Sequence, residues 1–537
     1  AFTTATNDDK TISLAGYSVS RSGNFTTDTL TFSGIDSLNT SGNITASALS
    51  FNGHNVSASG EMNVGSFGVT LDDTSGSLTL GGTLNVTSAL DLNGHSQAAL
   101  TGVINAPSLK LTATNVTASG ATVTASSKNG AGNSIEIAAG ESVTIGSSTL
   151  QTSGTDGDIV VKGKSINSDE SYNTSSTIDS TGGNVLLLSG VEADGVYTTA
   201  EGGSITLNKA TLKGGTVTAI SGNTAIENST ITANTLQAAG VETINIAGWN
   251  DATFADTASD TLTLSDTAVR SQNGSDAIDT VKLAGSNVTF GGGSTDASSF
   301  KANSVAVASA QRIAVNGIVD IIGADGLSLS GSDVTVNGTI QAKKIALAAS
   351  AADVSLKNTS HLAASGGVAG TNTITITANA GTIAANGSMS ADSITLSGKE
   401  IETGGTMSAD GNVTVSATNG ATNSAAITSA NGDILLDSSD GSAITSNGNL
   451  SAANGSITLG HTGGNATQEI TVGPASGSNT MTAQNVYLNA TDAITLKNID
   501  LTVTDASQNV SNDKYVFQVG AVTFKNSYKQ IKDKDNK

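Results

Sequence analysis

The sequence predicts an all-β protein whose chain coils as a parallel β-helix, or β-solenoid, with about 20 residues in each turn. Two observations carry this prediction: short segments that alternate apolar with polar residues, and the return of these segments at spacings of 19 to 23 residues. The composition is a further observation that supports the prediction, because the 537 residues include 62 Gly but only 3% aromatic residues and no Cys. A narrow coil has little room for large rings, so we expect a single elongated rod.

Residues 1–237 form the first predicted part of the solenoid, in which apolar residues align in two inward columns. The first column is Leu30, Leu49, Val69, Leu90 and Leu109. The second column is Phe32, Phe51, Leu71, Leu92 and Leu111. Polar residues stand between the columns, which is the period-2 pattern of a half-buried strand. Asn, Asp, Gly and Ser punctuate the segments and favour bends there.

An Asn-Gly-His triplet occurs twice in this part and ends at His54 and at His95. If these residues occupy equivalent places two turns apart, they lie about 10 Å from each other. That distance is too long for one shared metal ion without a ligand between them. We therefore interpret both as solvated corner residues and predict no metal site.

Residues 238–300 form a less regular segment in which the period weakens. It contains the single Trp, Trp249, and also Phe254, within the stretch AGWNDATFADTASD. We interpret this stretch as a loop or a distorted turn of the solenoid. The alternative is a protruding patch that binds a partner through Trp249 and Phe254.

Residues 301–510 form the second predicted part of the solenoid. Five apolar triplets begin at Ile374, Ile394, Val413, Ile434 and Ile457, and they are spaced by 19 to 23 residues. All but the Ile434 triplet have a polar residue in the middle, as expected of strands with one buried face. We expect one strand for each triplet, stacked in register on the next.

Residues 511–537 differ from the rest because they concentrate aromatic and basic side chains. The residues that we expect to act there are Tyr515, Phe517, Phe524, Lys525, Tyr528 and Lys529. The open end of a solenoid needs a cover, and the alternating segments YVFQV and AVTF fit a hairpin that caps the last turn. The alternative is a docking segment that binds the acidic body of a neighbouring copy. Phe2, near the N-terminus, fits the same two roles.

The net charge is −22, and only 13% of the residues are charged. This balance argues against a nucleic-acid partner, and no apolar run approaches the roughly 20 residues of a membrane span. Sugar hydrolysis needs two facing carboxylates, whereas the Asp residues here lie mainly in Gly- and Ser-rich corners. We therefore predict no catalytic residues and no enzymatic activity, with a polysaccharide-processing enzyme on a β-helix as the remote alternative.

Calcium is the one ion that the sequence leaves open, and no other cofactor is predicted. The corner NGDILLDSSDG contains Asp433, Asp437 and Asp440, which offer the hard oxygen ligands that calcium prefers. This corner matches neither the calcium-roll nonapeptide nor the EF-hand loop. We interpret it as a turn.

The stretch SITLSGKEIETGGTMSADGNVTVSATNG, which begins at Ser393, resembles the repeats of filamentous-haemagglutinin-type exoproteins and autotransporter passenger domains. The resemblance extends over most of the chain and implies a right-handed parallel β-helix on a bacterial surface. Most proteins of that type are adhesins, and some aggregate cells or build biofilm. The repeat encodes the coil, so the resemblance specifies the fold better than the ligand.

From these observations we expect a secreted, extracellular protein of the bacterial cell surface. As a rigid multivalent rod it would mediate adhesion, aggregation or matrix formation, with glycans, proteins or copies of itself as partners. The chain starts at Ala1 without an export signal, and we interpret it as a mature chain. The alternative is a self-assembling subunit of an extracellular filament or surface layer, a homo-oligomer whose specificity lies at the termini.

Overall fold

The computed structural model describes most of the chain, and all regular secondary structure in the described residues is β. Described are residues 11–70, 75–129, 132–154, 157–168, 175–180, 182–189, 191–193, 196–198, 203–221, 223–227, 229–240, 243–244, 261–265, 268–270, 280–291, 297–300, 304–321, 326–460, 467–503, 515–518 and 521–524. In this part of the chain no helix is long and apolar enough to cross a bilayer. The chain divides into two compact units, residues 1–286 and 287–537, here called unit 1 and unit 2.

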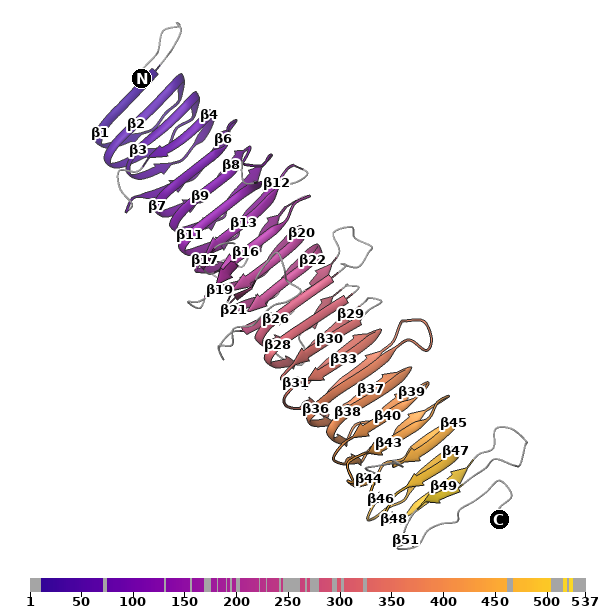
Figure 1. The fold of residues 1–537 in the computed structure, drawn as a ribbon. Coiled ribbons are helices and arrows are strands. Elements are labelled where there is room, and N and C mark those ends of the chain that lie inside the picture. The colour runs from indigo at the N-terminus through magenta and orange to yellow at the C-terminus, as the bar shows by residue number, and fades with distance from the viewer. Residues whose placement is uncertain are drawn as a thin grey trace. The chain divides into compact units, whose positions relative to one another are not determined.

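Both units are parallel β-solenoids, which confirms the predicted fold class (Figure 1). Strands of one turn pair in parallel with strands of the preceding and following turns, apart from one small antiparallel sheet. The described turns number about 18 and average about 22 residues, slightly more than predicted. The number of residues in a turn varies along the chain. Residues that hydrogen-bond between neighbouring turns are 18 residues apart at one place and 32 at another.

Each turn of unit 1 has three walls that follow one another along the chain. In β3 (Ile44–Ala58), residues 44–46 belong to wall 1, residues 48–53 to wall 2 and residues 55–58 to wall 3. β2 (Phe25–Thr40) crosses all three walls in the same way as β3. The strands that bend across two walls are β1 (Thr11–Arg21), β4 (Glu61–Thr70), β7 (Leu90–Leu100), β9 (Leu109–Ser119), β11 (Asn133–Gly146), β20 (Ala210–Ser221) and β22 (Thr230–Gly240). Short strands continue each wall. Wall 1 contains β6 (Thr83–Val86), β8 (Val103–Ala106), β10 (Thr122–Ala125), β12 (Thr149–Thr152) and β15 (Ser176–Asp179), and wall 2 contains β13 (Asp158–Gly163) and β16 (Val185–Ser189). Wall 3 contains β5 (Ser77–Leu80), β14 (Ser165–Ser168), β19 (Ser204–Asn208) and β21 (Asn223–Glu227).

The interior of unit 1 is filled by stacked apolar side chains, as predicted, but the predicted alignment is wrong in the third turn. Leu49 pairs with Phe67, and Phe51 pairs with Val69, so Val69 belongs to the second column and not to the first. The rings of Phe51 and Phe67 pack edge to face with their centroids 5.4 Å apart. This contact between buried rings favours the observed register. Leu71 lies outside the described residues.

The predicted register of unit 2 is confirmed. One column runs through β36 (Thr373–Ala385), β38 (Ser393–Thr403), β40 (Val413–Ala417), β43 (Ile434–Ser438) and β45 (Leu450–Leu459). Its members are Ile374, Ile394, Val413, Ile434 and Ile457. All five side chains are at most 1% exposed. The triplets are therefore the buried strands that the sequence indicates.

A ladder of polar side chains is also buried in unit 2. The hydroxyl of Thr403 donates to Asn423 Oδ1 at 2.8 Å, and Asn423 Nδ2 donates to Ser446 Oγ at 3.2 Å. The three residues lie at the ends of β38, β41 (Ala421–Asn423) and β44 (Ile444–Ser446) and are at most 2% exposed. Partners within the ladder offset the cost of burying these polar groups.

A three-stranded antiparallel sheet leaves unit 1 at the corner between wall 2 and wall 3. β17 (Val191–Ala193) and β18 (Val196–Thr198) follow β16, whereas β23 (Thr243–Ile244) follows β22. β18 pairs with both of the others, so segments from two turns join in one sheet. Trp249 and Phe254 come after β23 and lie outside the described residues, so the predicted loop or distorted turn and its alternative, a binding patch, both stay untested.

The C-terminal strands do not form the predicted hairpin. β50 (Tyr515–Gln518) pairs in parallel with β47 (Asn479–Asn489), and β51 (Ala521–Phe524) pairs in parallel with β48 (Ala493–Leu496). Both segments therefore extend the solenoid. Their period-2 pattern suits either arrangement, and register with the preceding turn prevails. Whether residues 511–537 act as a cap or as a docking segment stays a prediction.

Candidate functional site

Wall 1 of unit 1 carries a column of amide side chains that hydrogen-bond from turn to turn. Asn85 Nδ2 donates to Asn63 Oδ1, and Asn105 Nδ2 donates to Asn85 Oδ1, both at 2.7 Å. Further along the wall, Lys213 Nζ donates to a carboxylate oxygen of Asp179 at 3.1 Å. Stacked amides satisfy one another when they recur at the strand spacing of about 4.8 Å. Wall 1 is therefore a polar surface with a few charges.

Wall 2 of unit 1 carries alternating charges in its middle turns. Asp91, Lys110 and Glu136 are register partners on β7, β9 and β11. Opposite charges at neighbouring positions on adjacent strands attract each other. Outward positions of this solenoid thus accept charged side chains of both signs.

Wall 3 of unit 1 differs from both because two of its outward columns carry no charge, and its charged outward residue, Glu227, lies beside these columns at the end of β21. Two outward columns run through β3, β5, β7, β9, β11, β14, β19 and β21, and we call them the neutral face. The first column is Asn55, Ser77, Gln97, Asn115, Ser142, Ser165, Ser204 and Asn223. The second column is Ser57, Thr79, Ala99, Thr117, Thr144, Asn167, Thr206 and Ala225. Apart from the two alanines, every member offers a hydroxyl or an amide.

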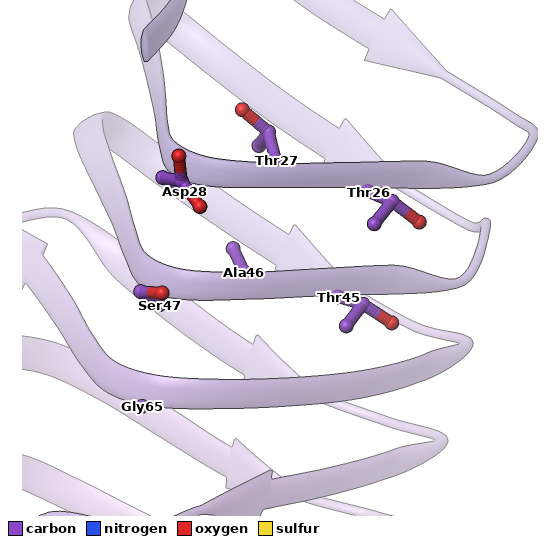
Figure 2. A pocket seen from close by; sticks show the side chains of 7 residues that line it. All are labelled: Thr26, Thr27, Asp28, Thr45, Ala46, Ser47 and Gly65. Carbon is purple, nitrogen blue, oxygen red and sulfur yellow. The ribbon is translucent and has the colours of Figure 1, made fainter. Parts of the chain in front are cut away.

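A shallow depression of about 420 Å³ opens in the first turns, where wall 1 bends into wall 2. Its lining is Thr26, Thr27, Asp28, Thr45, Ala46, Ser47 and Gly65 (Figure 2). Figure 2 shows Asp28 and Ser47 at the bend, and Thr26 above Thr45 on successive strands. One carboxylate and several hydroxyls can hold a small polar molecule by hydrogen bonds. The lining does not supply the two facing carboxylates that glycoside hydrolysis uses.

His95 lies inside the coil, so its interpretation as a solvated corner residue is wrong. Its side chain is 2% exposed, and neither ring nitrogen has a hydrogen-bond partner. Burial lowers the pKa of His95. The cause of the error is register: Asn55, which follows His54, aligns through Ser77 with Gln97. His54 and His95 are therefore not at equivalent positions.

A loop of unit 2, residues 365–372, presents an exposed apolar side chain, because Val368 is 77% exposed. A carboxylate oxygen of Asp392 fixes the loop by accepting hydrogen bonds from the backbone N–H of Gly370 at 2.6 Å and of Asn372 at 3.0 Å. Asn372 Nδ2 donates to the same oxygen at 2.8 Å. These hydrogen bonds hold the pKa of Asp392 below its ordinary value, and the bond from the backbone N–H of Asn372 contributes most.

The corner that suggested calcium uses its first carboxylate to link turns. Asp433 Oδ1 accepts a hydrogen bond from the backbone N–H of Ser456 at 2.7 Å, and the backbone N–H of Asp433 donates to Asn412 Oδ1 at 2.9 Å. Within the ranges that the structure describes, no three His, Cys, Asp or Glu residues gather in an arrangement that would hold a metal ion. Calcium binding, which the sequence left open as an alternative to a simple turn, stays untested.

The residues predicted to cap or dock fall mostly outside the description. Tyr515, Phe517 and Phe524 lie in β50 and β51, whose backbone alone is described. Outside the described residues lie Phe2, Lys525, Tyr528 and Lys529. Sequence reasoning missed the neutral face, which has no local signal, and the loop fixed by Asp392, for which the run SGGVAGT was a signal.

Comparison with known proteins supplies no relative from which a site could be transferred. No protein-family model, no curated protein and no solved structure matches the chain. What the chain does must therefore be argued from its own surfaces, among them the three walls of unit 1.

Proposed function

We propose that this chain is a secreted structural and adhesive protein of a bacterial cell surface, which holds other surfaces through many weak contacts. The observation that carries the proposal is the division along each strand: apolar side chains fill the interior, and outward side chains recur as columns of Ser, Thr and Asn. Weak sites repeated at about 4.8 Å act together through their effective concentration. The resemblance of the repeat that begins at Ser393 to bacterial surface adhesins supports the same role.

The partners that suit such a surface are polar polymers of neighbouring cells, either glycans or proteins. Hydroxyl and amide groups both donate and accept hydrogen bonds, so the columns can meet many different polar groups with modest affinity. The net charge of −22 favours solubility and keeps copies of the chain apart in dilute solution. Affinity would then arise from the number of contacts and not from one pocket.

Adhesion of coated particles tests the proposal. Beads that carry the full chain at several surface densities are applied under flow to immobilised glycans and to bacterial cells. Retention should rise steeply with density, whereas the same chain in solution should bind weakly, because only the beads are multivalent. If the beads detach at the same force as beads coated with albumin, at every density and on every surface, the adhesive role is refuted.

A self-assembling subunit of an extracellular filament or layer is the second candidate, and one specific observation favours it. Adhesion to varied partners does not require a surface without charge. The two columns of the neutral face nevertheless contain no charged residue. A contact between walls of two copies of the same acidic chain would be favoured by such uncharged columns.

A further inference from the structure

We propose that the neutral face is an interface through which two copies of this chain associate side by side. The inference goes beyond adhesion and does not depend on it, because a chain that adheres to nothing else can still pair with itself. The occupant is a second copy, which brings its own neutral face into contact with the first.

Charge is the first reason. Two chains that each carry −22 repel each other wherever charged walls meet. Walls 1 and 2 present Asp179 and Glu136 among their outward residues, whereas the neutral face presents no charged residue in two columns of eight. Interface cores are depleted of charged residues because burying a charge is costly. Among the walls of unit 1, the neutral face therefore offers the pair of outward columns on which two copies meet with the least repulsion.

Self-complementarity is the second reason. Hydroxyl and amide side chains both donate and accept, so this face can hydrogen-bond to a rotated copy of itself, as a two-fold interface demands. Two of its amides are already oriented by bonds within the chain: Ser77 Oγ donates to Asn55 Oδ1, and Ser142 Oγ donates to Asn115 Oδ1, each at 2.7 Å. Oriented side chains lose less entropy when a partner binds.

The area of the face indicates the strength of the contact. Eight strands about 4.8 Å apart, each four residues long, cover roughly 38 Å by 13 Å, or about 500 Å² per copy. The total of about 1,000 Å² lies at the low end for specific interfaces. We therefore expect a weak dimer in solution that becomes populated where chains are concentrated, as on a surface.

A sugar polymer is the competing occupant, and composition disfavours it. Sugar rings commonly stack on aromatic side chains, and ligand sites are commonly concave. The neutral face contains no aromatic residue, and its outward positions follow regular strands. These features match another flat wall of hydroxyl and amide groups better than they match a saccharide.

Sedimentation velocity of the full chain, over a range of concentrations at low and at high NaCl, tests the proposal. The unmodified chain should dimerise with rising concentration, and salt should strengthen the dimer because it screens the repulsion between acidic copies. Thr117→Glu, at an exposed position of the neutral face, should raise the dimer dissociation constant at least tenfold. Thr122→Glu adds the same charge to wall 1 and should change that constant less than twofold.

Thr117→Val provides the neutral counterpart and should keep the dimer. Far-UV circular dichroism of each variant checks that the solenoid is intact. The proposal is overturned if the unmodified chain stays monomeric at both salt concentrations, if Thr117→Glu and Thr122→Glu weaken association equally, or if neither does. It is also overturned if the chain stays monomeric and a neutral polysaccharide binds it in a manner that Thr117→Glu abolishes.

Discussion

Replacement of Phe51 by alanine should destabilise the first turns of unit 1 by about 4 kcal/mol. The side chain of Phe51 is fully buried, and its ring centroid lies 5.4 Å from that of Phe32 and 5.4 Å from that of Phe67. Alanine leaves a cavity with a ring above it and a ring below it. Neither turn can close that cavity without breaking its own register, and the two aromatic contacts are lost as well.

Hydrogen exchange of the full chain, followed by mass spectrometry, measures this loss locally. Each 1.4 kcal/mol is a factor of ten in an equilibrium constant, so a loss of about 4 kcal/mol corresponds to roughly 700-fold faster exchange. Where the free energy of local opening in the unmodified chain is already below about 4 kcal/mol, protection should be lost completely. The effect should be concentrated in β2–β4, because turns of a solenoid contact only their neighbours. Phe51→Leu, which keeps most of the volume, should cost less than about 1.5 kcal/mol.

Two results would refute this reasoning. Exchange in β2–β4 that rises less than tenfold in Phe51→Ala would mean that the aromatic column does not hold these turns together. Exchange that rises equally in β38 and β40 of unit 2 would mean that the chain unfolds as one cooperative body. The nearest-neighbour description of the solenoid would then be wrong.

Three further perturbations test buried and bound polar groups. Because burial lowers the pKa of His95 below its ordinary value of 6.5, the unfolded chain binds the proton more readily. Unit 1 should therefore lose stability as the pH falls below about 6.5, and His95→Leu should reduce the fall in its thermal midpoint between pH 7.5 and 5. Asn423→Ala leaves two buried hydroxyls of the polar ladder without their amide partner and should lower the stability of these turns by about 2–3 kcal/mol. Hydrogen exchange in β38 and β44 measures this loss. The control Thr422→Ala, at an outward position, should lower the stability by less than about 0.5 kcal/mol. Hydrogen bonds lower the pKa of Asp392, so the carboxylate stabilises the loop fully at a pH above its ordinary pKa of 3.8, and this stability is lost as the pH falls through the lower pKa of the folded chain. Asp392→Asn should speed proteolytic cleavage at the loop at neutral pH. Equal cleavage of the unmodified chain and the variant would show that the carboxylate does not fix the loop.

The sequence predicts the inward columns well where corner lengths are nearly constant, as in unit 2. It fails in the third turn of unit 1 for a definable reason. Phe67 and Val69 both point inward, and a shift of two residues preserves the alternation of inward and outward positions. Period-2 patterning therefore cannot choose between Phe67 and Val69 as the partner of Leu49. The packing of two rings makes that choice, and it is a property of the folded interior.

His95 and the neutral face show two other limits of sequence reasoning. The strand register shifts between Leu92 and His95, where Gly94 adopts a φ of 83°, so alternation counted along the chain breaks at the bend. The neutral face is assembled from eight segments whose outward residues become neighbours only once the register of every turn is known. Composition shows that charge is scarce on average, but it does not show on which wall charge is absent.

Corners absorb the variation in length between turns, while walls keep their register. Hydrogen bonds between neighbouring turns of wall 3 or its edges join residues that are 19, 27 and 40 apart in sequence, yet the two outward columns of that wall continue through all of them. Outward positions are also free of the core, since equivalent positions on walls 1 and 2 hold Asp, Glu and Lys. Neither packing nor strand pairing therefore requires the neutral face to be uncharged. Two adjoining columns without charge favour contact with a second copy of this acidic chain, and that is the ground of the proposed interface.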